Sequence, residues 1–104
     1  LLCFGTAVNP GLRALCCEYT VGKITDAAAV SAYAAEHGVT LAVIGPEAPL
    51  DAGVADALLA DGVGVVGPTQ AHAQIECSKA FALNLLKKYK MRGLPEFREF
   101  TSME

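Results

Sequence analysis

The sequence lacks tryptophan, and its 8 basic residues are outnumbered by 11 acidic ones, which gives a net charge of -3. A nucleic-acid surface needs a basic patch, so this balance argues against one. The one basic cluster, Lys87, Lys88 and Lys90, is typical of a solvated helix face. No apolar run approaches the roughly 20 residues that span a bilayer, and no basic segment precedes a short hydrophobic one. We therefore expect a cytoplasmic protein with neither nucleic-acid nor membrane partners.

The sequence also lacks the cysteine spacing of a metal site. Its 4 cysteines, Cys3, Cys16, Cys17 and Cys77, include no C-x-x-C pair and are too few for a secreted disulfide scaffold. We expect reduced, buried thiols and no metal ligands among them.

Apolar residues, in contrast, are abundant. They make up 53% of the 104 residues, and the mean hydropathy is +0.38. So short a domain seldom contains so much apolar sequence, which suggests part of a larger core. The chain has no initiator methionine and opens on Leu1-Leu2-Cys3-Phe4, which resembles a buried strand. We expect it to begin within a domain.

The central stretch runs from Thr40 to Leu50. Residues 40–44 are predicted to form a strand buried on both faces, which Gly45-Pro46 ends abruptly. Glu47 then lies at the carboxyl end of the strand, the edge where open α/β sheets bind ligands. The alternative is that Glu47 is only an acid favouring the dipole of a helix that starts near Leu50.

Helical and extended patterns alternate along the rest of the chain, which predicts parallel strands joined by right-handed crossovers. The predicted strands are 1–4, 19–21, 40–44 and 62–66. The predicted helices are 12–16, 27–36, 50–61, 69–76 and 78–90, with caps at Thr25-Asp26, Thr69 and Ser78.

The turn Asn9-Pro10-Gly11 follows the first predicted strand. One interpretation is a loop whose amides contact a phosphate or a sugar. The other is an ordinary turn, and the residues alone favour it.

Three segments, in this order and spacing, resemble a known family. They are V-I-G-P-E-A-P-L at 43–50, G-P-T at 67–69, and Glu76 followed by S-K-A-F at 78–81. Together they are similar to the amino-terminal domain of the phosphoribosylamine-glycine ligase (glycinamide ribonucleotide synthetase) family of the ATP-grasp superfamily. The turn at residues 9–11 and G-L-P-E-F at 93–97 look most like its archaeal members.

The resemblance implies an α/β fold: a Rossmann-like parallel sheet with flanking helices, the domain that precedes the ATP-grasp fold. This domain would cover residues 1–77, and residues 78–104 would be a linker helix and the start of the ATP-grasp region. The family's glycine-rich G-G-G-R-E-H element is missing, so the first strand of the sheet is expected to be lacking too. In a Rossmann-like order that strand would lie centrally, between residues 1–4 and 40–44.

The family joins glycine to 5-phosphoribosylamine in purine biosynthesis, using ATP, which yields ADP and phosphate, and Mg²⁺ or Mn²⁺. By this resemblance Glu47, Asn9, Gly11 and Pro46 would contact the phosphoribosylamine. Lys79 would face the ATP phosphates. The metal and most of the ATP would be bound by domains that this chain does not contain. We therefore expect no catalytic and no metal-binding residue here, an inactive fragment, and a monomeric intact enzyme.

The chain departs from the family pattern at Arg92, where many members have proline. A rival interpretation is a non-catalytic Rossmann-like module that binds a nucleotide or a sugar phosphate. A G-x-G-x-x-G loop would favour dinucleotide binding, and the sequence has none.

Overall fold

The computed structural model describes residues 1–100 as an alternation of short strands and helices. The strands are β1 (Leu2–Gly5), β2 (Glu18–Val21), β3 (Leu41–Val43) and β4 (Gly64–Val66). The helices are α1 (Pro10–Leu15), α2 (Ala27–Glu36), α3 (Glu47–Asp51), α4 (Val54–Ala60), α5 (Gln70–Cys77) and α6 (Lys79–Lys88).

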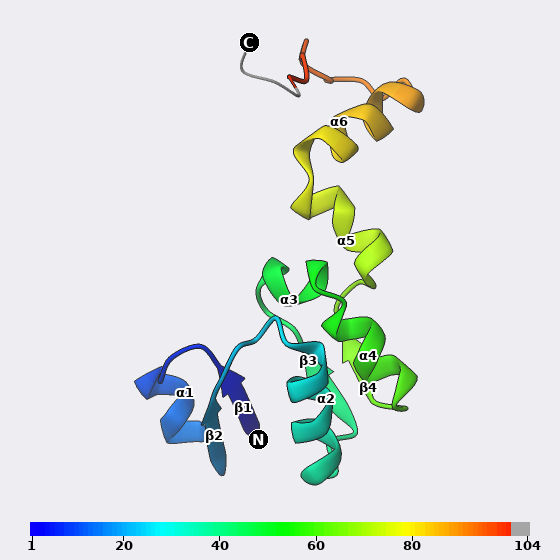
Figure 1. Cartoon of the computed structure of the whole chain (residues 1–104). Coiled ribbons are helices and arrows are strands. Elements are labelled where there is room, and N and C mark those ends of the chain that lie inside the picture. The colour runs from blue at the N-terminus through cyan, green and yellow to red at the C-terminus, as the bar shows by residue number, and fades with distance from the viewer. Residues whose placement is uncertain (101–104) are drawn as a thin grey trace.

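The strands form two separate parallel pairs. β1 pairs with β2 and β3 pairs with β4, in registers that place Cys3 opposite Tyr19 and Ala42 opposite Val65. No ladder joins β1 to β3 within the described part of the chain, and the two pairs stand side by side in Figure 1. Parallel pairs joined through helices confirm the predicted α/β, Rossmann-like class.

Helix α2 connects the two strand pairs. The Asp26 side chain caps it by accepting a hydrogen bond from the Ala29 amide at 3.0 Å. Its buried Ala34 packs with α4 in the main core, whose buried members are Ala34, Val54, Leu58 and Val63. Its Tyr33 ring meets Phe4 of β1 edge-on, with 5.4 Å between the centroids. One helix therefore contacts both sheets on the same face.

The prediction that the central strand is buried on both faces is wrong. Leu41 is 62% exposed and Val43 is 73% exposed, whereas Ala42, which points the other way, packs against the core. The reason is that α2 and α4 cover only one face of the β3–β4 sheet (Figure 1). The expected apolar character of the strand was correct, but one face has no cover within residues 1–100.

The predicted helix at 50–61 is two helices. α3 already begins at Glu47, and Gly53, with a φ of 79°, separates it from α4. A left-handed residue ends an α-helix, and glycine adopts that conformation at least cost. Amphipathic spacing continues through the break, which is why the sequence suggested one helix.

Helix α5 packs against α3 and α4 through the buried Ala73, and α6 extends from it away from the rest of the molecule (Figure 1). The Cα radius of gyration, 17.2 Å, therefore exceeds the roughly 13 Å of a compact chain of this length. Ser78 caps α6 as predicted, since its hydroxyl accepts from the Phe81 amide at 3.2 Å. Thr69 precedes α5, but its hydroxyl bonds the His72 ring at 2.9 Å and makes no cap hydrogen bond.

The thiols also differ from expectation. All four cysteines are free, but none is buried: Cys17 is exposed and the other three are half-buried. Partial burial raises the pKa of the Cys16 and Cys77 thiols.

Candidate functional site

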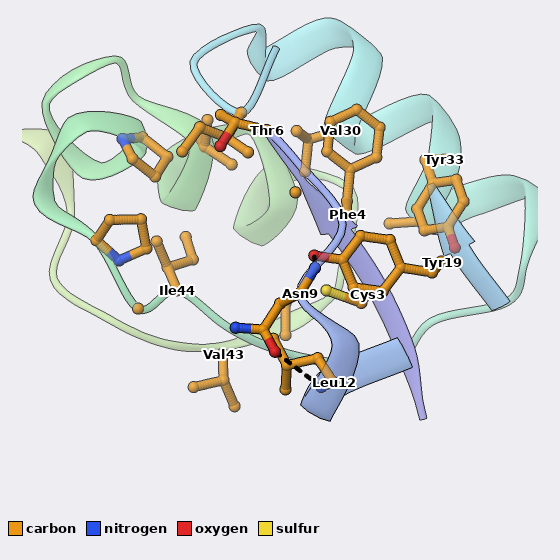
Figure 2. A pocket seen from close by; sticks show the side chains of 18 of the residues that line it. Cys3, Phe4, Thr6, Asn9, Leu12, Tyr19, Val30, Tyr33, Val43 and Ile44 are labelled. Carbon is orange, nitrogen blue, oxygen red and sulfur yellow. Dashed lines mark hydrogen bonds between the residues drawn. The ribbon is translucent and has the colours of Figure 1, made fainter. Parts of the chain in front are cut away.

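A cavity of about 780 Å³ lies between the two strand pairs. Figure 2 shows Cys3 and Phe4 of β1 on one side of it and Val43 and Ile44 on the other. Residues of α2 and α4 also line it. The loops that follow β1 and β3 both reach it, so the carboxyl ends of these two strands lie at the same cavity.

The strand edges that face this cavity are unpaired. Leu1 and Gly5 accept hydrogen bonds from the β2 side through their carbonyls, so the intervening Leu2 and Phe4 direct their backbone groups away from β2. By the same alternation, Thr40 and Ile44 bond β4, and Leu41 and Val43 face away from it. In the described part of the chain, no strand lies hydrogen-bonded on that other side of β1 or β3, so the outward-facing N–H and C=O groups of these four residues have no strand partner.

The loop after β1 contains Asn9, which lines the cavity. Its Oδ1 accepts hydrogen bonds from the amides of Gly11 at 3.0 Å and Leu12 at 3.1 Å, which caps α1. The amide of Gly11 is thus already engaged by a side chain. The turn Asn9-Pro10-Gly11 is the beginning of a helix, and its role toward a ligand stays a prediction.

The side chain of Tyr19, on β2, hydrogen-bonds the backbone of this loop. Its hydroxyl accepts a hydrogen bond from the Asn9 amide at 3.2 Å and donates one to the Ala7 carbonyl at 2.7 Å. The sequence alone predicts only that Tyr19 lies in an extended segment. No local pattern marks a tyrosine whose hydroxyl bonds a neighbouring loop, because the contact depends on the register between β1 and β2.

The loop after β3 brings Pro46 to the cavity, where it precedes α3 as its N-cap residue. Glu47 is the first residue of α3; it is exposed, and its side chain does not line the cavity. Lys79 is the first residue of α6 and is also exposed, on a helix well away from the cavity. The structure thus brings Asn9 and Pro46 together and places Glu47 next to Pro46.

The cavity is apolar. It is lined by side chains that carry no charge, and its free hydrogen-bonding groups at the loop end include the Thr6 hydroxyl and the Asn9 side-chain nitrogen. Such a lining suits a bound small molecule, and the described residues that form it include no carboxylate, imidazole or amine side chain. Within residues 1–100, no three His, Cys, Asp or Glu side chains are grouped to hold a metal ion, so Mg²⁺ or Mn²⁺ does not fit the residues present.

One ionic contact ties β2 to α2. His37, at the carboxyl end of α2, lies 3.0 Å from a Glu18 carboxylate oxygen through Nε2 and 2.8 Å from the Tyr33 carbonyl through Nδ1. Both partners accept hydrogen bonds, so the doubly protonated ring suits the site. The hydrogen bond to the Tyr33 carbonyl, and then the Glu18 charge, raises the pKa of His37 despite partial burial.

Strand pairs, flanking helices and a loop-lined cavity at the strand ends define a Rossmann-like α/β domain. Residues 2–76 match the family model described as phosphoribosylglycinamide synthetase, N domain, and the chain belongs to this family. No helix among the described residues is long and apolar enough to cross a membrane.

Curated relatives agree with the family model. The phosphoribosylamine-glycine ligase of Methanosarcina barkeri is 48% identical over 93 residues, which is 89% of this chain and 22% of the relative. The protein of the same name from Methanoregula boonei is 49% identical over 92 residues (88% and 22%), and that from Thermococcus gammatolerans is 44% identical over 95 (91% and 22%). The chain therefore spans about a fifth of the length of these relatives.

Proposed function

We propose that this chain is the amino-terminal part of a ligase that joins glycine to 5-phosphoribosylamine with ATP, and that it helps to bind the phosphoribosylamine. The observation that carries the proposal is the match of residues 2–76 to a family whose curated relatives bear this name. The position of the G-P-E-A-P-L segment supports it, because Gly45 and Pro46 lie at the cavity and Glu47 follows them.

The role proposed for this domain is binding and orientation. The loop ends of β1 and β3 offer hydrogen-bonding groups above an apolar cavity, which suits a small polar substrate held at a strand end. Glu47 adds a carboxylate that accepts hydrogen bonds from sugar hydroxyls or an amine. Residues 1–77 would form this domain, and residues 78–104, of which 101–104 lie outside the described part, would lead into the ATP-grasp region.

The chemistry itself belongs, in this proposal, to polypeptide beyond these residues. ATP and Mg²⁺ or Mn²⁺ would be bound there, with Lys79 as the contribution of this chain to the ATP phosphates. The intact enzyme would act as a cytoplasmic monomer in purine biosynthesis. The apolar, uncharged lining of the cavity accords with a domain that orients substrate and performs no step alone.

The test uses Glu47→Gln in the intact ligase, because glutamine keeps the shape and removes the charge. We expect the KM for 5-phosphoribosylamine to rise roughly tenfold or more, as expected for one lost charge-assisted hydrogen bond, while the KM values for ATP and glycine stay unchanged. Glu36→Gln is the matched control, an exposed carboxylate in the last turn of α2. Wild-type activity of Glu47→Gln at limiting phosphoribosylamine would refute the role given to Glu47.

A further inference from the structure

We propose that Tyr19 is a positioning residue that fixes the loop at residues 6–9 and thereby aims the Asn9 side-chain nitrogen at the cavity. The part of this inference that concerns substrate rests on the proposed function, whereas the part that concerns the loop does not.

The Tyr19 hydroxyl joins two backbone groups of one short loop, the Ala7 carbonyl and the Asn9 amide. The backbone of residues 6–8 makes no other hydrogen bond within the described chain. These three residues are exposed, so packing does little to order them. The hydroxyl is consequently the main anchor of the segment between β1 and α1.

Gly5 makes the approach of this hydroxyl possible. A Cβ at Gly5 would lie 2.8 Å from the Tyr19 oxygen, closer than such atoms come in proteins. The ring therefore occupies space that any other residue at position 5 would fill. A close backbone approach and two hydrogen bonds together define one fixed position for the hydroxyl.

Asn9 is oriented by the same contacts. Two amides donate to its Oδ1, so this oxygen is identified by its partners, and its Nδ2 is left as a free donor. Figure 2 shows the Asn9 side chain extending toward the side of the cavity where Val43 and Ile44 lie. A free N–H donor there suits an oxygen acceptor, such as a hydroxyl or phosphate oxygen of the sugar phosphate.

The first measurement is hydrogen exchange of the Asn9 amide in the intact ligase. Tyr19→Phe keeps the ring and removes the hydroxyl, and we expect exchange at Asn9 to accelerate roughly tenfold or more, while exchange in the β1–β2 ladder is unchanged. Tyr33→Phe is the matched control, since the buried Tyr33 hydroxyl has no hydrogen-bond partner among the described residues. An unchanged Asn9 exchange rate in Tyr19→Phe would overturn the inference.

The second measurement is the KM for 5-phosphoribosylamine in the intact ligase. Asn9→Asp keeps an oxygen that caps α1 but loses the Nδ2 donor, so we expect it to raise this KM. Tyr19→Phe should raise the same KM roughly threefold to tenfold and leave the KM for ATP unchanged.

The two variants separate the two proposals. If Asn9→Asp raises the KM and Tyr19→Phe does not, the positioning role is refuted and the proposed function stands. If neither variant changes it while Tyr19→Phe accelerates exchange at Asn9, the loop is anchored as described but does not bind this substrate.

Discussion

A cavity separates β1 from β3, and both strands have an unpaired edge. We therefore predict that one strand added between them will stabilise the chain strongly. The perturbation is an apolar segment of about five β-branched residues, attached to Leu1 through a flexible Gly-Ser linker. Parallel neighbours need a crossover of a dozen or more residues, so a linker of roughly 15 residues permits insertion. The strand would lie between the unpaired edges and join both pairs into one sheet.

The expected magnitude follows from the groups that the strand would satisfy. Leu2, Phe4, Leu41 and Val43 each present one N–H and one C=O, and a net hydrogen bond contributes about 0.5–1.5 kcal/mol, so the ladder contributes about 4–12 kcal/mol. Ordering five residues costs about 5–10 kcal/mol of backbone entropy, which roughly offsets this gain. The surplus comes from side chains facing α2, where each buried Val or Ile contributes about 1.5–3 kcal/mol.

The assay is equilibrium unfolding in urea. With two such side chains buried, we expect the free energy of unfolding to rise by about 3–6 kcal/mol and the m-value to increase, because more surface becomes buried. The control is the same extension with proline at its centre, which removes a ladder donor. Equal midpoints and m-values for the two extended chains and the original chain would refute the central position of the strand.

Two further predictions concern single side chains. His37 has a raised pKa when folded, so its contact with Glu18 stabilises the chain fully below the ordinary pKa of about 6.5 and less as the pH rises through the folded-state value. Urea midpoints measured from pH 5.5 to 8.5 should therefore fall more in the wild type than in His37→Gln, and equal slopes would disprove the contact's role. Lys79→Ala in the intact ligase should raise the KM for ATP and leave the KM for glycine unchanged. The control, Lys88→Ala at the other end of α6, should change neither KM. An unchanged KM for ATP in Lys79→Ala would refute the role of Lys79.

The sequence predicted the elements well where local chemistry decides them. Asp26 and Ser78 cap the helices for which they were predicted, and the Gly-Pro pairs end their strands. Residues 27–36 form a helix over the predicted span because strong helix formers lie between a cap and Gly38, whose φ is 61°. These features depend on neighbours within a few residues, and a single sequence contains them in full.

The errors concern burial, which depends on partners far along the chain. Val43 and Ala42 are adjacent and both apolar, yet one is exposed and the other packs on the core, because only one face of β3 has helices over it. Gly53 likewise interrupts a helical spacing that is otherwise regular, because its φ of 79° ends α3 before α4 begins. Apolar periodicity indicates that a residue is suited to burial, but whether it is buried depends on which elements pack against it.

The candidate site was accessible to sequence reasoning only in part, for the same reason. Asn9 and Pro46 follow strands, and parallel strands bring their carboxyl ends together, so their common location was predictable from topology. Tyr19 lies ten residues from Asn9 in the chain and on another strand, and its hydroxyl reaches the loop only because Cys3 pairs with Tyr19 and position 5 is glycine. A shift of the β1–β2 register by one residue would turn the ring to the opposite face of the sheet and leave the loop without its anchor. The function proposed for Tyr19 is thus a property of strand register, which no residue of the loop encodes by itself.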